Sequence, residues 1–217
     1  MRQTIPVGQP AQPVALALLA DLKADLGVSD DTQDVRLESL LLDASDQVLT
    51  FIRRPILRAE WRDTLTLGPD EQRTGLLVCC RPLQAITAFS VNGSPWSVDA
   101  VAALNLAPDS GVIYPPDGWG TLWRCGRYVV TYQAGWTAPT IGDDGKPVLG
   151  DLPRAIQQAT RLAAAALYHS GGRDPLLRSE SEQGVGSSSW ASPAAGSGGL
   201  PQAAADALRS FGGIGVR

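Results

Sequence analysis

The sequence predicts an α+β protein: a helical bundle of three to four helices with an inserted small antiparallel β-sheet or sandwich and an extended C-terminal arm. Apolar residues recur at helical spacing near both ends of the chain, whereas in a middle segment apolar residues recur with a period of two, as in a strand. Charged residues make up only 18% of the chain, which also holds 23 Gly and 16 Pro. The expected parts are an N-terminal extension (1–13), a helical core (14–58 with 151–170), a β-rich module (59–136) and a C-terminal arm with a short terminal helix (171–217).

Two helices are expected before Pro55. In the first, from about Val14, leucines recur three and four residues apart, and Gly27 follows as a left-handed stop. The second should run from about Asp31 to Arg53, and Pro55 ends it because the residue before a proline is pushed out of the α region. Its apolar stripe consists of Leu37, Leu40, Leu41, Ala44, Val48 and Ile52.

The middle of the chain, from about Glu60 to Gln133, is rich in β-branched and aromatic residues between turn signals. The strand candidates are residues 61–67, 75–79, 86–91, 111–114 and 127–132. The dipeptide Asn92-Gly93 favours a tight reversal after the third candidate. These segments together predict a small antiparallel sheet or sandwich.

A further helix should open at Asp151-Leu152-Pro153 and end at Gly171-Gly172. Its expected buried face consists of Ala155, Ile156, Ala159, Leu162, Ala163, Ala166 and Leu167. Residues 173–199 are dominated by Ser, Gly, Glu and Ala, a composition that buries too little apolar surface to offset its ordering entropy, so we expect an arm or linker. A short amphipathic segment, Leu200 to Phe211, follows.

Charge and cysteine content narrow the classes of function. A net charge of −4 without a basic cluster argues against ordinary nucleic-acid binding, which needs lysine and arginine to neutralise phosphates. Three cysteines do not make an even disulfide framework, so reduced thiols are expected. Neither a signal peptide nor a membrane-spanning helix is expected, because the apolar run from Val14 is cut short by Asp21.

No residue pattern predicts a catalytic or metal centre. His169 is the one histidine, near the end of a predicted helix where the dipole favours it. Cys79-Cys80 lacks the spacer of redox and zinc motifs. The loop Asp143-Asp144-Gly145-Lys146 lacks the further oxygens of a calcium loop, so we interpret it as a polar turn. We expect no enzymatic activity, no metal and no cofactor.

Six tryptophans stand out, five of them in or beside the β-rich segment. They could form a carbohydrate-stacking platform or serve as core and interface anchors. An interface is favoured because tryptophan is enriched at interface hot spots. A small hydrolase built on acidic residues is a further alternative.

Two groups of motifs occur in a characteristic order. The first is Leu22-Lys23-Ala24-Asp25-Leu26-Gly27, an acidic turn at residues 31–34, and a long helix ending at Arg53. The second is Val129-Val130-Thr131-Tyr132-Gln133-Ala134-Gly135, then Leu152-Pro153 and an alanine-rich helix. This order resembles the head-tail connector (adaptor) proteins of long-tailed bacteriophages over most of residues 15–211. The loop 140–150 is longer than that family's usual step, and the segment 115–125 contains an unusual Trp-Gly-x-x-Trp.

The resemblance implies a homo-oligomeric ring of twelve subunits beneath the portal, made in the host cytoplasm and located in the virion neck. The ring would contact the portal and a stopper or tail-completion protein, and genomic DNA would pass through it without sequence recognition; no membrane is involved. The expected portal-binding residues are Leu200, Leu208, Phe211, Ile214, Val216 and Arg217. The expected subunit-interface residues are Asp34, Glu38, Arg53, Arg54, Trp119, Trp123 and Arg161. A stopper or tail-completion ring protein, or a Trp-rich carbohydrate-binding module, is the alternative.

Overall fold

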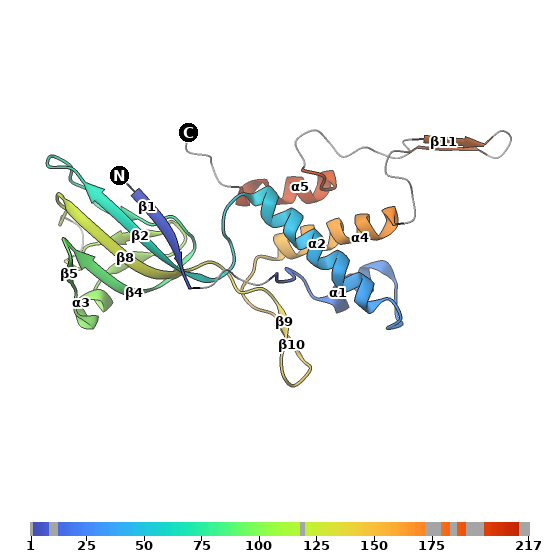
Figure 1. Ribbon diagram of the computed structural model, residues 1–217, viewed down its shortest axis with the longest axis horizontal. Helices are drawn as coiled ribbons and strands as arrows, with labels where there is room; N and C mark the ends of the chain where they lie inside the picture. Colours follow the sequence, from blue (N-terminus) through green and yellow to red (C-terminus); the bar gives the residue numbers. More distant parts are fainter. Residues whose placement is uncertain are drawn as a thin grey trace. The chain divides into compact units, whose positions relative to one another are not determined.

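The computed structural model describes residues 2–8, 13–117, 120–171, 179–182, 186–189 and 198–212. The chain folds into two units, each built from separate stretches of sequence (Figure 1). The sheet unit comprises residues 1–12 and 55–137, and the helical unit comprises residues 13–54 and 138–217. Helices and antiparallel sheets are both present, so the predicted α+β class is confirmed.

The helical unit contains four helices in the described residues: α1 (Leu19–Leu26), α2 (Asp34–Ile52), α4 (Arg154–Ser170) and α5 (Gln202–Leu208). A 3-10 turn, Arg209–Phe211, follows α5. Helix α2 packs along α4, and both α1 and α5 contact each of these two helices. The fully buried side chains of this core include Leu16, Leu22, Leu37, Val48, Ile52, Ile156, Leu200 and Leu208.

Helix α2 forms where its apolar stripe predicts, and every predicted stripe residue except the half-buried Leu40 is buried. The helix begins at Asp34 rather than Asp31, because the acidic residues before it are engaged in a turn. It ends at Ile52, ahead of Pro55, where Arg53 adopts a left-handed φ of 57° and its N–H donates to the Leu49 carbonyl at 3.1 Å.

Helix α1 is shorter than predicted, beginning at Leu19 instead of Val14. The preceding segment bonds to another helix: the Leu16 N–H donates to Ser45 Oγ at 3.0 Å, and the Leu16 side chain is buried. The predicted stop is confirmed, because Gly27 has a φ of 70° and its N–H caps the helix.

Helix α4 follows Pro153 as predicted, but its buried face is rotated from the expected one. The buried positions are Ile156, Ala159, Thr160, Ala163 and Ala164. The polar Thr160 can be buried because its hydroxyl donates to the Ile156 carbonyl at 2.9 Å. Leu162 and Ala166, which were expected on the buried face, are exposed. The expected burial of Leu162 and Ala166 is therefore wrong.

The described residues of the sheet unit form two antiparallel sheets. Five strands lie in the order β1 (Arg2–Val7), β2 (Ala59–Leu67), β8 (Gly126–Ala134), β4 (Leu83–Val91) and β5 (Ser94–Pro95). The second sheet has the order β3 (Leu76–Leu77), β7 (Val112–Tyr114) and β6 (Asn105–Ala107), and a short helix, α3 (Val98–Ala102), packs on β4. All five predicted strand segments contain a strand, and Asn92 and Gly93 form the predicted reversal with φ values of 52° and 86°.

The core of the sheet unit is built from alternating residues. On β8, Tyr128, Val130, Tyr132 and Ala134 are buried, and the partner positions on β2 face the same core. Phe89, Leu76, Ile113 and Trp123 complete it from other strands and a loop. An aromatic and aliphatic interior of this kind explains the β-branched and aromatic richness of the sequence.

Both chain ends differ from the expected extensions. Residues 2–7 form the edge strand β1, paired along its whole length with residues 60–65 of β2. Near the other end, Ser179–Glu182 (β11) pairs with Gly186–Ser189 (β12), while the rest of the stretch 172–197 lies outside the described residues. Helix α5 belongs to the helical core rather than to an arm, because it packs on α4 with its apolar face buried.

Candidate assembly surfaces

The residues considered as candidates for catalysis or metal binding, His169 and the pair Cys79-Cys80, lie in different units of the fold. His169 is exposed at the end of α4, with its ring 5.5 Å from that of Tyr168. Cys79 is exposed and its neighbour Cys80 is buried. Within the described ranges, no three His, Cys, Asp or Glu side chains gather as a metal site would require. Among the same residues, no helix is both long and apolar enough to span a membrane.

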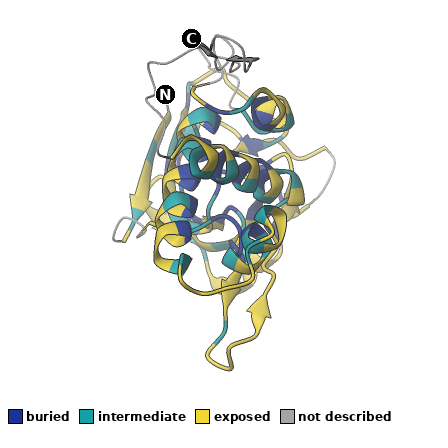
Figure 2. Ribbon diagram, turned by 90° about the vertical axis from the view of Figure 1, so that its right-hand side faces the viewer, coloured by how far each residue is buried: buried dark blue, intermediate teal, exposed yellow. Residues whose placement is uncertain are grey.

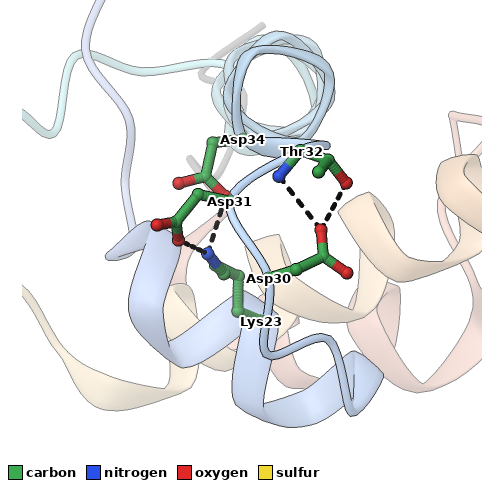
Figure 3. Close-up of polar contacts among 5 residues, drawn as sticks. All are labelled: Lys23, Asp30, Asp31, Thr32 and Asp34. Carbon is green, nitrogen blue, oxygen red and sulfur yellow. Dashed lines mark hydrogen bonds and ion pairs between the residues drawn. The ribbon is translucent and has the colours of Figure 1, made fainter.

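Lys23 joins α1 to the turn that starts α2 (Figure 3). Its ammonium donates to Asp31 Oδ1 and to Asp34 Oδ1, each at 2.7 Å. These bonds, that to Asp31 first, raise the pKa of Lys23. The neighbouring Asp30 accepts from the hydroxyl and the N–H of Thr32, which lowers the pKa of Asp30. Asp34, an expected interface residue, is therefore paired within its own chain.

Arg161, also an expected interface residue, likewise forms ion pairs with residues of α1. Its guanidinium lies 3.1 Å from Asp25 and 3.6 Å from Asp21, so it joins α4 to α1. Three-quarters of its side chain is withdrawn from solvent. Like Asp34, Arg161 thus holds helices of the same chain together.

The remaining expected interface residues fall in different surroundings. Glu38 is exposed on α2, and Arg53 is exposed at the end of the same helix. Arg54 Nε donates to the Phe211 carbonyl at 2.8 Å, which fastens the C-terminal turn to the end of α2. Trp119 lies outside the described residues.

Trp123 is a core residue, so its expected interface role is wrong. Only 5% of its surface is exposed, and its Nε1–H donates to the Ile113 carbonyl at 3.0 Å. Its ring lies 5.5 Å from Phe89 and 5.4 Å from Tyr128. The other described tryptophans, Trp61, Trp96 and Trp136, are half-buried, so this part of the chain presents no exposed tryptophan platform for a sugar.

The expected portal-binding residues fall into three groups: buried, half-buried and outside the described residues. Leu200 and Leu208 are fully buried in the helical unit, so the expectation that their side chains anchor a partner is wrong for this fold. Phe211 is half-buried beside Arg54. Ile214, Val216 and Arg217 lie outside the described residues.

An ion pair between a partly exposed arginine and a buried carboxylate, which sequence patterns did not reveal, fixes β1 to the rest of the sheet unit. Asp63 on β2 is fully buried, and its Oδ2 accepts from Arg2 Nη2 at 3.1 Å and from the Cys79 N–H at 2.7 Å. The Cys80 N–H next to it donates to the Tyr132 hydroxyl at 3.1 Å. Burial raises the pKa of the Cys80 thiol to about 12 and also raises the pKa of Tyr132.

A hairpin projects from the helical unit (Figures 1 and 2). It consists of β9 (Thr140–Ile141) and β10 (Pro147–Val148), which pair only with each other. Ile141, Val148 and Leu149 are 58%, 52% and 62% exposed. At its base a groove of about 360 Å³ is lined mainly by apolar side chains, including those of Leu19, Leu42 and Ile141.

The turn of this hairpin is well defined by local hydrogen bonds. The Gly142 N–H donates to the Lys146 carbonyl at 2.8 Å, and the Gly145 N–H donates to the Gly142 carbonyl at 2.9 Å. The Lys146 N–H donates to Asp144 Oδ1 at 3.1 Å, as in an Asx turn. The structure thus agrees with the predicted polar turn, and adds two short strands that the sequence did not indicate.

Comparisons with known proteins give a match in fold. No protein-family model matches the chain, and no curated protein matches it either. A chain in the solved structure "Neck of empty GTA particle computed with C6 symmetry" has 18% identity and a TM-score of 0.52, covering 99% of this chain and 97% of that chain. This likeness extends over both units and shows a shared fold.

Two further solved structures match more loosely. A chain of "Neck of native GTA particle computed with C12 symmetry" has 20% identity and a TM-score of 0.45, covering 77% of this chain and 83% of that one. A chain of "Virion of native gene transfer agent (GTA) particle" has 19% identity and a TM-score of 0.46, covering 79% and 86%. By its likeness to the first of the three structures, the chain shares the fold of a protein in the neck of a GTA particle.

Proposed function

We propose that this protein is a non-enzymatic structural subunit of the neck of a phage-like particle. In this role it forms an adaptor ring between the portal and the next neck component. The observation that carries the proposal is the fold shared with a chain of a GTA particle neck over nearly the full length of both chains. The order of sequence motifs, which resembles the phage adaptor family, is an independent support.

The proposed ring contains twelve subunits, as the family resemblance implies. That number is a multiple of six, and the neck whose chain shares the fold was computed with C6 symmetry. The ring surrounds the path of the genome. A subunit with a net charge of −4 suits such a path, because a wall that bound phosphates tightly would retard the passing DNA.

The portal contact in this proposal lies in the last residues of the chain, Ile214, Val216 and Arg217. They follow Phe211, whose carbonyl is fastened to Arg54. The preceding helix α5 serves as a fixed base, since its apolar side chains are already buried in the subunit. In this proposal a stopper or tail-completion protein contacts the surfaces of the ring that do not face the portal.

The test is co-expression with the portal protein encoded by the same particle. The complex is isolated through a tag on the portal and imaged by electron microscopy, and the number of added subunits is counted by native mass spectrometry. A ring of added density directly on the portal supports the proposal. A portal that gains no density overturns it, and attachment only to a portal that already carries another ring assigns the chain to a stopper role.

A further inference from the structure

The β9–β10 hairpin has the properties of an unsatisfied contact surface. Three large aliphatic side chains, Ile141, Val148 and Leu149, are each more than half exposed on it. A two-stranded hairpin is at best marginally stable in water without further strands or packing. Yet its turn is fixed by several hydrogen bonds, so it projects in one defined shape. Pro147 has no N–H to donate along the edge of β10, so a partner would be held mainly by the side chains of the hairpin.

The hairpin is also complementary to a second copy of itself. Its acidic residues, Asp143 and Asp144, follow β9, whereas its one basic residue, Lys146, precedes β10. A rotation about an axis parallel to the hairpin places β9 of one copy beside β10 of the next, in antiparallel orientation because β9 and β10 are themselves antiparallel. The same rotation brings the acidic side of one turn to the basic side of the next.

The contacts within one copy leave the carboxylate of Asp143 available to pair with a neighbouring copy. Lys146 lies 3.7 Å from Asp144 of its own turn, and both side chains are largely exposed. Asp143 has no polar partner in the described part of the chain. A head-to-tail contact of this kind uses different edges on its two sides, which is the type of contact that closes a ring.

We propose that the β9–β10 hairpin is the contact between neighbouring copies of this chain. The β9 side of one copy meets the β10 side of the next, with Asp143 of one copy against Lys146 of the next and with Ile141 and Leu149 covered in the interface. The apolar groove at the hairpin base, lined by Leu19 and Leu42, extends the surface that the neighbour covers. This inference rests on the proposed ring and names the surface that closes it.

The test uses charge reversal in the full chain bound to its portal, with ring occupancy measured by native mass spectrometry. Asp143→Lys and Lys146→Asp alone should each lower occupancy by at least about tenfold, because like charges then meet across an interface. An equal mixture of the two variants should restore it, since each introduced lysine then faces an introduced aspartate and each remaining Asp143 faces a remaining Lys146. The double variant should also assemble, because both members of the pair are exchanged.

Two controls separate this contact from a change in fold. Asp70→Lys makes the same charge change on an exposed turn of the sheet unit and should leave occupancy unchanged. Each variant should keep the circular dichroism spectrum and melting temperature of the wild type, since the altered side chains are exposed. In the same way, Ile141→Ser with Leu149→Ser should lower occupancy, whereas Val98→Ser, at a residue that is still more exposed but lies in the sheet unit, should not.

The outcomes distinguish the inference from the function on which it rests. Wild-type rings together with normal assembly of both single variants overturn the hairpin contact and leave the ring intact. Single variants that fail and a mixture that also fails overturn the direct Asp143–Lys146 pairing. Wild-type chain that adds no ring to the portal overturns the proposed function, and the hairpin contact falls with it.

Discussion

Arg2 and Asp63 lie 61 residues apart in the sequence and form an ion pair of 3.1 Å that ties the first strand to the interior of the sheet unit. Asp63 is fully buried, whereas a third of the Arg2 side chain is exposed. A buried carboxylate needs such partners, because its desolvation is otherwise uncompensated. The N-terminal residues are thus part of the fold.

Replacing Arg2 by Gln should therefore lower the free energy of unfolding by about 1.5–3 kcal/mol, the range for a hydrogen bond to a charged group. The measurement is urea denaturation of the full chain followed by tryptophan fluorescence. Adding Asp63→Asn to Arg2→Gln should recover part of the loss, because the unpaired charge is removed. Arg73→Gln breaks only an exposed pair with Glu71 at 3.7 Å and should have little effect; equal losses for Arg2→Gln and Arg73→Gln would contradict the role of burial.

Lys23 should make the stability of the helical unit depend on alkaline pH. Its pKa in the folded chain is raised above the ordinary 10.5 by the hydrogen bonds to Asp31 and Asp34. The stabilisation is therefore complete below pH 10.5 and is lost as the pH rises through the raised pKa. Lys23→Met should lower the melting temperature at pH 7, and its difference from wild type should disappear once Lys23 is deprotonated. Lys146→Met, which removes only an exposed pair, should show no such difference.

Thiol reactivity should distinguish the three cysteines. Cys79 and Cys125 are exposed, whereas Cys80 is buried and its pKa is raised to about 12. Because the thiolate is the reactive form, a disulfide reagent at pH 8 should modify two thiols rapidly and the third only on unfolding. Cys79→Ser and Cys125→Ser should each remove one rapid equivalent, whereas Cys80→Ser should remove none. Three rapid equivalents in the native chain would contradict the burial of Cys80.

Local patterns predicted the elements whose stabilisation is local or repeated along the sequence. The stripe from Leu37 to Ile52 predicted α2, and Asn92-Gly93 predicted a reversal, because helical periodicity and turn propensity depend on neighbouring residues. Strand β1 could not be found in this way. It contains Pro6, its side chains are mostly exposed, and its pairing with β2 spans more than fifty residues.

The candidate site was harder to predict than the fold for a related reason. Tryptophan is typical of both cores and interfaces, so composition alone could not place Trp123 in the core. Leu200 and Leu208 have the spacing of an amphipathic face, but that spacing does not say whether the face meets its own chain or a partner. Asp34 and Arg161 found partners on α1 that only the three-dimensional arrangement reveals.

Gly135 should not tolerate a side chain. Its φ is +104°, and a Cβ atom there would lie 2.5 Å from the backbone oxygen of Leu57. Gly135→Ala should thus lower the free energy of unfolding by at least about 2 kcal/mol, through backbone strain and the steric conflict. Gly68→Ala is the matched control, since its Cβ would meet nothing closer than 3.8 Å. Equal stability of the two variants in urea would show that the end of β8 can move away from Leu57.

In the C-terminal region, residues up to Gly212 should contribute to folding, whereas residues 213–217 should contribute to portal attachment. Leu208 is fully buried, so Leu208→Ala should lower the free energy of unfolding by about 2–5 kcal/mol, as measured by urea denaturation. Leu162→Ala, on the exposed face of α4, is the control in the same unit and should cost much less. Deleting residues 213–217 leaves every described buried side chain in place, so stability should remain at the wild-type value while portal attachment is lost. Normal attachment of the truncated chain would exclude the tail as the portal contact. A large loss of stability on the same deletion would instead make the tail part of the fold.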